Sequence, residues 1–133
     1  MARGMVIAFW SPKGGVGKTL LSVAVALRMS ERQRTVIIDG NADNPDLVTL
    51  FQAPGLPNIG SWPGRVEAEE AERHLVRWTS RLFLLPGPTR FIDEAVLSGD
   101  AMEAAISSLA GAGFHVVVDL PCGLRDSTLV ALD

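Results

Sequence analysis

The chain has 133 residues, of which 47% are hydrophobic and 20% are charged, and its formal net charge is −3. This balance is typical of one ordinary globular domain, and a single cysteine, Cys122, excludes a framework of internal disulfides. No apolar run reaches the length of a membrane span, no secretory signal precedes the first apolar run, and nothing indicates a basic surface for nucleic acid. These features predict a cytoplasmic location.

Strand and helix signals alternate along the chain. Residues 5–10 are an apolar run that predicts a buried strand, and the apolar spacing after it predicts a helix from about Gly17 to Glu31. A β-branched run over 35–38 predicts a parallel strand that ends at Asp39. The later predicted elements are a short helix over 46–51, an irregular segment over 54–64, a helix over 65–80, a strand over 82–85, a short helix over 92–97, a helix over 100–110 and a strand over 114–118 that ends at Asp119.

Short apolar strands separated by helices predict βαβ units. The expected fold class is therefore α/β, with a parallel sheet flanked by helices on both faces, in one domain over residues 1–133. The predicted helix over 65–80 begins with several glutamates, which suit the positive end of the helix dipole. A solvated surface is the simpler interpretation of that acidic half, and a partner-binding surface is the alternative.

A glycine-rich segment joins the first predicted strand to the first predicted helix, in the context of a phosphate-binding loop. Its glycines let backbone N–H groups converge on one point, and with the helix N-terminus they form a nest for an anion. Lys18 is placed to reach the β- and γ-phosphates, and the Thr19 hydroxyl is placed to bind Mg²⁺. Pro12 departs from the generic loop, which has glycine there. The segment reads Ser11-Pro12-Lys13-Gly14-Gly15-Val16-Gly17-Lys18-Thr19.

The seven residues from Lys13 to Thr19 resemble the deviant Walker A loop of the MinD/ParA-like ATPases. This resemblance implies a P-loop NTPase fold and a site for Mg²⁺ with ATP or ADP. The nucleotide-binding residues that it implies are Lys13, Gly14, Gly15, Val16, Gly17, Lys18, Thr19 and Leu20. Members of the family are longer than this chain, so the resemblance also implies that the chain is a truncated N-terminal part of the domain.

Two aspartates follow predicted strands, at the sheet edge where ligands bind in parallel α/β folds. Asp119, with Pro121 and Gly123 after it, is similar to the family's Asp-x-Pro-x-Gly Walker B and switch II pattern. Asp39 resembles the first switch I aspartate of the family. With Thr19, these two carboxylates are the predicted Mg²⁺ ligands, held directly or through water.

Two positions depart from the family pattern. Asn41 stands where the family has a second switch aspartate, which orients the attacking water, and Asp43 lies two residues further on. Leu20 stands where the family has a threonine that reaches the α-phosphate, so one hydrogen bond to nucleotide is lost. The resemblance implies catalytic roles for Lys13, Lys18 and either Asn41 or Asp43, with slow hydrolysis.

The predicted function is an ATP-dependent dimerisation switch used in spatial positioning of a division site, plasmid, chromosome, flagellum or pilus. In such proteins ATP lies between two subunits, the lysine at position 13 crosses to the partner subunit's phosphates, and a protein partner stimulates hydrolysis. The pattern after Asp39 favours the pilus-assembly and septum-site branch. The alternatives are an ATPase for metallocofactor maturation and a nucleotide-binding scaffold with weak hydrolysis. Association with DNA, or peripherally with a membrane, stays open.

Overall fold

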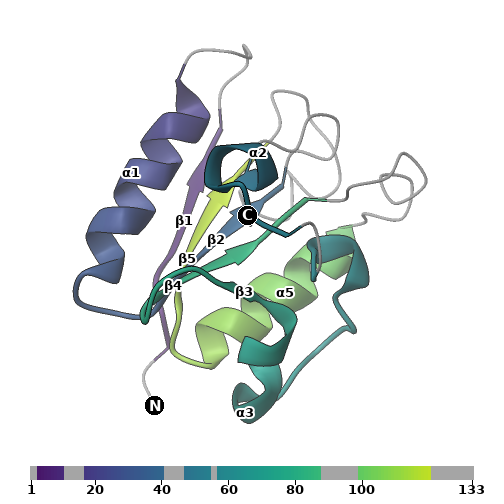
Figure 1. The fold of residues 1–133 in the computed structure, drawn as a ribbon. Helices are drawn as coiled ribbons and strands as arrows, with labels where there is room; N and C mark the ends of the chain where they lie inside the picture. Colours follow the sequence, from purple (N-terminus) through teal and green to yellow (C-terminus); the bar gives the residue numbers. More distant parts are fainter. Residues whose placement is uncertain (1–2, 11–16, 41–46, 55–56, 88–98, 121–133) are drawn as a thin grey trace.

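The computed structural model describes residues 3–10, 17–40, 47–54, 57–87 and 99–120, and its centre is a five-stranded sheet (Figure 1). The strands lie in the order β1-β5-β2-β4-β3. Neighbouring strands run parallel from β1 to β4, and β3 is antiparallel to β4. The strands are β1 (Val6–Phe9), β2 (Thr35–Asp39), β3 (Val76–Arg77), β4 (Leu82–Leu85) and β5 (His115–Asp119).

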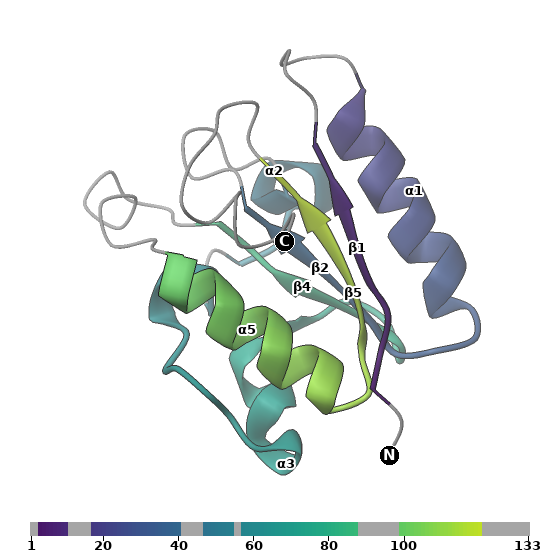
Figure 2. The same ribbon diagram turned by 180° about the vertical axis from the view of Figure 1, so that it is seen from behind.

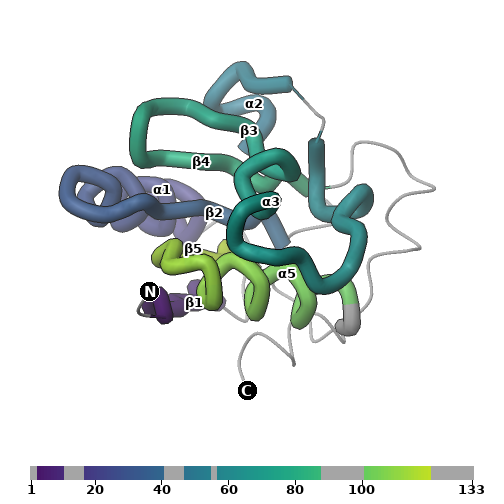
Figure 3. The backbone as a smooth tube through the Cα atoms, turned by 90° about the horizontal axis from the view of Figure 1, so that it is seen from below, coloured from purple at the N-terminus to yellow at the C-terminus, as the bar shows by residue number. Residues whose placement is uncertain are grey.

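Helices cover both faces of the sheet, so the molecule has three layers (Figures 1 and 2). One face carries α1 and α2, and the opposite face carries α3 and α5, as the view from below also shows (Figure 3). The helices are α1 (Lys18–Ser30), α2 (Leu47–Phe51), α3 (Ala68–Ala71) and α5 (Gly99–Gly111), with 3₁₀ turns at Ile59–Ser61 and Glu72–His74. This architecture confirms the predicted α/β class with a parallel sheet flanked by helices.

Side chains along the central strands point alternately to the two faces of the sheet, and so contribute to two halves of the hydrophobic core. Ile37 of β2 and Val117 of β5 pack on the α1 side, whereas Val36 and Val116 pack on the α5 side. Successive side chains of a strand point to opposite faces, so a strand that is covered on both faces needs a continuous apolar run. All five residues of β2 are buried, which is why its β-branched sequence predicts the strand so well.

The predicted helix over 65–80 is wrong. The chain forms only the single turn of α3 and a 3₁₀ turn, becomes extended at Leu75 and then enters β3. Leu75 belongs to the core on the α5 side, and Val76 belongs to the core on the α1 side. Two consecutive buried residues on opposite faces are a strand pattern, and a helix cannot deliver both. The acidic residues before this point are exposed, as a solvated surface requires.

The other predicted elements that fall on described residues agree with the structure within a residue or two, but the strand over 5–10 is not buried as predicted, because every residue of β1 is partly or fully exposed. The predicted helix over 17–31 is α1, the strand over 114–118 is β5, and the helix over 100–110 is α5. The segment 54–64, expected to be irregular, contains the 3₁₀ turn at Ile59–Ser61. The helix over 92–97 and Cys122 lie outside the described residues. In the part of the chain that the structure describes, no helix is both long and apolar enough to cross a membrane.

Candidate functional site

The two predicted aspartates lie side by side where β2 and β5 end. Asp39 and Asp119 are partners in the parallel register of these strands, and both residues are buried. The backbone N–H of Gly40 donates to the carbonyl oxygen of Asp119 at 2.8 Å, which ties the two strand ends together. A Cβ at position 40 would stand 3.0 Å from that oxygen, so glycine allows the close approach. The sheet therefore brings both carboxylates to one edge.

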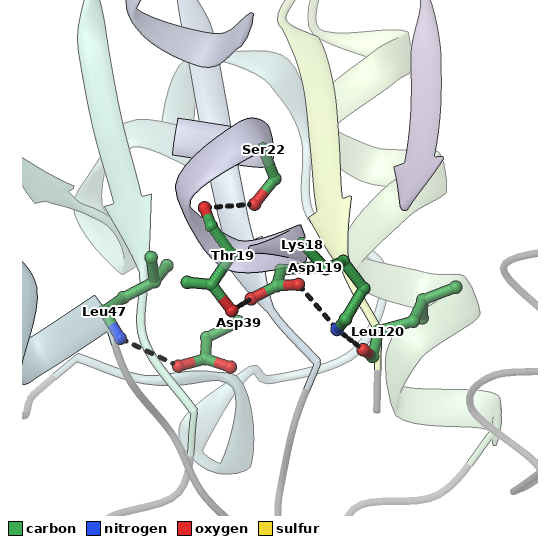
Figure 4. Close-up of polar contacts among 7 residues, drawn as sticks. All are labelled: Lys18, Thr19, Ser22, Asp39, Leu47, Asp119 and Leu120. Carbon is green, nitrogen blue, oxygen red and sulfur yellow. Dashed lines mark hydrogen bonds and ion pairs between the residues drawn. The ribbon is translucent and has the colours of Figure 1, made fainter. Parts of the chain in front are cut away.

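Lys18 and Thr19, in the first turn of α1, both bind the carboxylate of Asp119 (Figure 4). The Nζ atom of Lys18 lies 2.8 Å from Oδ1, and the hydroxyl of Thr19 donates to Oδ2 at 2.8 Å. Lys18 also donates to the carbonyl oxygen of Leu120, directly after β5. The side chain of Lys18 is 12% exposed and that of Asp119 is 1% exposed, so this ion pair is largely shielded from water.

The N-terminus of α1 lies beside this cluster, because Lys18 and Thr19 are its first two residues. Its N-cap residue, Gly17, has φ +78°, a left-handed conformation that side chains other than glycine adopt with strain. The first amides of a helix have no partner within the helix, and Gly17 supplies no side-chain cap for them. Together with the helix dipole, these amides favour an anion beside Lys18.

Asp39 is positioned from the other side of the site, by α2. The backbone N–H of Leu47, the first residue of α2, donates to Oδ2 of Asp39 at 3.1 Å, and this bond is buried (Figure 4). A carboxylate that accepts from a backbone amide is held in one orientation. The same bond fixes the start of α2 against the end of β2. Any movement of Asp39 is therefore linked to the position of α2.

The donor set at this edge suits Mg²⁺. This ion prefers oxygen ligands in an octahedron, and two adjacent ligands at about 2.0–2.1 Å stand about 2.9 Å apart. The Thr19 hydroxyl and the nearer oxygen of Asp119 are 2.8 Å apart, close to that spacing. Asp39 and Asp119 also bring two buried carboxylates to the same edge of the sheet, and carboxylate oxygens are ligands that Mg²⁺ accepts. No group of three or more histidine, cysteine, aspartate or glutamate residues forms a metal site among the described residues.

The structure thus brings Lys18, Thr19, Asp39 and Asp119 together, with Gly17 beside them. Leu20 lies on the same helical turn, but its side chain is 65% exposed. The other predicted site residues, Lys13, Gly14, Gly15, Val16, Asn41 and Asp43, lie outside the described residues.

Sequence reasoning missed three supporting groups. The buried hydroxyl of Ser22 donates to the carbonyl oxygen of Thr19 at 2.9 Å. Its place three residues after Thr19 in a helix is a signal for such a bond back to the preceding turn. The other two groups are the backbone amide of Leu47 and the backbone carbonyl of Leu120. Their roles cannot be predicted from residue type, because nearly every residue carries the same backbone groups.

Comparison with known proteins finds one curated relative for most of the chain. It is an uncharacterised ATP-binding protein of Methanocaldococcus jannaschii, 25% identical over 126 residues, which are 91% of this chain and 46% of that protein. No protein-family model matches the chain. The chain spans about half the length of the curated relative that it matches.

Solved structures with the same fold include two ATPases and a synthase. A ParA family ATPase from Chlorobium tepidum has a TM-score of 0.75 at 15% identity, over 98% of this chain and 56% of that one. The septum site-determining protein MinD from Pyrococcus horikoshii, complexed with Mg-ADP, has a TM-score of 0.75 at 19% identity, over 97% and 54%. Cobyrinic acid a,c-diamide synthase from Mycobacterium smegmatis, with bound ADP and magnesium, has a TM-score of 0.63 at 25% identity, over 97% and 56%. The chain therefore has the P-loop fold of the MinD and ParA ATPases.

Proposed function

We propose that this chain is the nucleotide-binding part of a MinD/ParA-type ATPase that binds Mg-ATP at the carboxyl ends of β2 and β5. The observation that carries the proposal is the cluster of Lys18, Thr19 and Asp119, with Asp39 beside it, at the N-terminus of α1. A cation, a hydroxyl and two carboxylates in this arrangement match what a triphosphate with its Mg²⁺ requires. The similar proteins agree with this proposal, since they include an ATP-binding protein and a MinD complexed with Mg-ADP.

Binding would exchange the partners of Asp119. Without nucleotide, Lys18 satisfies this carboxylate and the carbonyl of Leu120. With Mg-ATP bound, Lys18 would contact the β- and γ-phosphates, and Asp119 and Thr19 would hold the Mg²⁺ that neutralises the phosphate charge. The carboxylate therefore keeps a positive neighbour in both states. The carbonyl of Leu120 loses its lysine, so the chain directly after β5 responds to the nucleotide.

Hydrolysis and dimerisation are the finer parts of the proposal. Phosphoryl transfer depends mainly on positioning and charge stabilisation, so the rate depends on how well the attacking water is held. Asn41 offers a carbonyl acceptor without charge, and Asp43 is the alternative group, so hydrolysis is expected to be slow. Lys13 would reach the phosphates of a second subunit, and ATP would then promote a homodimer.

A role in spatial positioning is supported by the likeness to two MinD proteins, a cell division ATPase from Pyrococcus furiosus and the septum site-determining protein from Pyrococcus horikoshii. An ATP-dependent step in metallocofactor maturation is the second candidate, favoured by the likeness to a cobyrinic acid a,c-diamide synthase. Only one cysteine is present in the 133 residues, so a metal-binding cysteine pair cannot form within one copy of this sequence.

Titration of the protein with Mg-ATP by calorimetry tests the nucleotide site. We expect binding by the wild type and none by Lys18→Ala, because the loss removes the cation that faces the phosphates. Arg28→Ala is the matched control. It removes an exposed cation from the same helix, and that cation pairs with Glu31 at 2.8 Å, away from the site. Equal affinity of Lys18→Ala and wild type would refute the proposal.

Sedimentation with a slowly hydrolysed ATP analogue tests the role of Lys13. The wild type is expected to form a dimer with the analogue and to stay monomeric with ADP. Lys13→Ala is expected to bind the analogue and remain a monomer, because the residue acts on the partner subunit. A dimer that forms equally well in this variant would show that Lys13 does not cross the interface.

A further inference from the structure

The two helices that begin at the nucleotide site end at the same turn. α1 begins with Lys18 and Thr19, and α2 begins with Leu47, whose amide holds Asp39. The turn between β3 and β4, residues 78–81, contacts the far ends of both helices. Seen from below, this turn lies between the end of α1 and α2 (Figure 3). It is therefore connected to both sides of the site.

Arg81 joins the 78–81 turn to α1. Its Nε atom donates to the carbonyl oxygen of Ser30 at 3.0 Å, and its Nη2 atom donates to that of Glu31 at 2.7 Å. The last carbonyls of a helix have no partner within the helix, and they form the negative end of its dipole. The backbone carbonyl of Arg81 also accepts from the amide of Thr35 at 2.8 Å. Since Thr35 begins β2, the turn is tied to the strand that ends at Asp39.

Trp78 joins the same turn to α2. Its ring meets that of Phe51, the last residue of α2, edge to face, with the centroids 5.1 Å apart. Phe51 is buried, whereas Trp78 is 46% exposed. A large aromatic ring stabilises a fold most when it is fully buried, so core packing does not explain this half-exposed position. Trp78 places a ring at the surface that is in direct contact with the end of α2.

Hydrogen bonds hold the 78–81 turn in one shape. The hydroxyl of Thr79 accepts from the amides of Arg81 and Leu82, at 3.2 and 2.9 Å. The carbonyl oxygen of Leu82 accepts from the amides of Trp78 and Thr79, at 2.9 and 3.1 Å. A side-chain oxygen that binds nearby amides stabilises a turn in the way that backbone bonds do. A displacement of one helix end is therefore passed through the turn instead of being absorbed in it.

We infer that the 78–81 turn couples the nucleotide site to the exposed ring of Trp78, which has different surroundings with and without nucleotide. The inference rests on the proposed function, in which Lys18 leaves Asp119 for the phosphates. α1 is a stiff rod about 20 Å long, because each of its 13 residues adds about 1.5 Å. A change of contacts at its first turn shifts the end that Arg81 holds. By linkage, a molecule that prefers one arrangement of Trp78 would alter the affinity for nucleotide.

Fluorine NMR of the protein labelled with 5-fluorotryptophan tests the inference. The three tryptophans give three resonances, each assigned by replacement with phenylalanine. We expect Mg-ADP to shift the resonance of Trp78 and to leave that of Trp62, in the core on the α5 side, nearly unchanged. Arg81→Ala should reduce the shift of Trp78 at least about twofold, because α1 is then no longer joined to the turn. Arg65→Ala, the matched control, removes another exposed arginine, which pairs with Glu103 at 2.6 Å on the α5 side, and should leave the shift unchanged.

Calorimetry with Mg-ADP on the same samples separates this inference from the proposed function. Absence of binding refutes the proposed function and the inference with it. Binding without a shift of Trp78, or with equal shifts in the wild type and Arg81→Ala, overturns the inference alone. Equal shifts of Trp62 and Trp78 overturn it too, because the change then spreads through the whole protein. A shift that Phe51→Leu also reduces supports it and assigns part of the coupling to α2. Spectra recorded well below the thermal unfolding midpoint of each variant exclude a simple loss of stability.

Discussion

The centre of the sheet and its β1 edge have similar sequences but different surroundings. β2 and β5 are apolar runs that end in aspartate, and their apolar residues are buried on both faces. β1 is an equally apolar run, yet all four of its residues are partly or fully exposed. An apolar run predicts a strand, but the crossovers decide which strands become central. The central pair is buried on both faces and positions the carboxylates, whereas β1 is the exposed edge of the sheet among the described residues.

The largest expected difference between the sheet centre and the β1 edge is in how much a truncated side chain lowers the free energy of unfolding. Ile37→Ala in β2 should lower the free energy of unfolding by about 4 kcal/mol, because it leaves a cavity between close-packed strands and α1. Ile7→Ala in β1 makes the same chemical change and should cost about 1 kcal/mol in residues 1–133, since Ile7 is only partly buried and borders a hollow between β1 and α1. Denaturant unfolding of both variants measures the difference. Equal losses would mean that the edge is as well packed as the centre.

A second test concerns the ion pair between Lys18 of α1 and Asp119 of β5, and measures how much this pair contributes to the free energy of unfolding. Asp119→Asn should lower the free energy of unfolding by about 2 kcal/mol without nucleotide, because the bonds from Lys18 and Thr19 lose their charged acceptor. Lys18→Met alone should cost a similar amount, and a double-mutant cycle should show coupling of about 1–3 kcal/mol. Additive effects would indicate that the two side chains do not interact in solution.

The convergence of the two aspartates was predictable, because parallel strands end at one edge and each apolar run stops at an aspartate. The start of α1 was predictable as well, since Gly17 marks it. Three features depend on tertiary contacts that one sequence does not display. Leu75 and Val76 leave the helical pattern because each fills a different half of the core. Leu47 acts through its backbone, and the exposure of β1 depends on which strand lies beside it.

The smallest expected effect concerns Leu20, which follows Thr19 in the site and is 65% exposed on α1. If its position faces nucleotide, Leu20→Thr adds a hydroxyl that donates one hydrogen bond to phosphate, worth about 0.5–1.5 kcal/mol, or up to about tenfold in the dissociation constant for Mg-ATP. Threonine has a lower helix propensity than leucine, so the same substitution should lower the free energy of unfolding by roughly a few tenths of a kcal/mol. Leu21→Thr, one position further around the helix, is the control and should not tighten binding. Calorimetry and thermal unfolding of both variants measure the two effects. Tighter binding by Leu20→Thr alone assigns the residue to the site, whereas equal affinity of both variants and the wild type shows that position 20 does not contact the nucleotide.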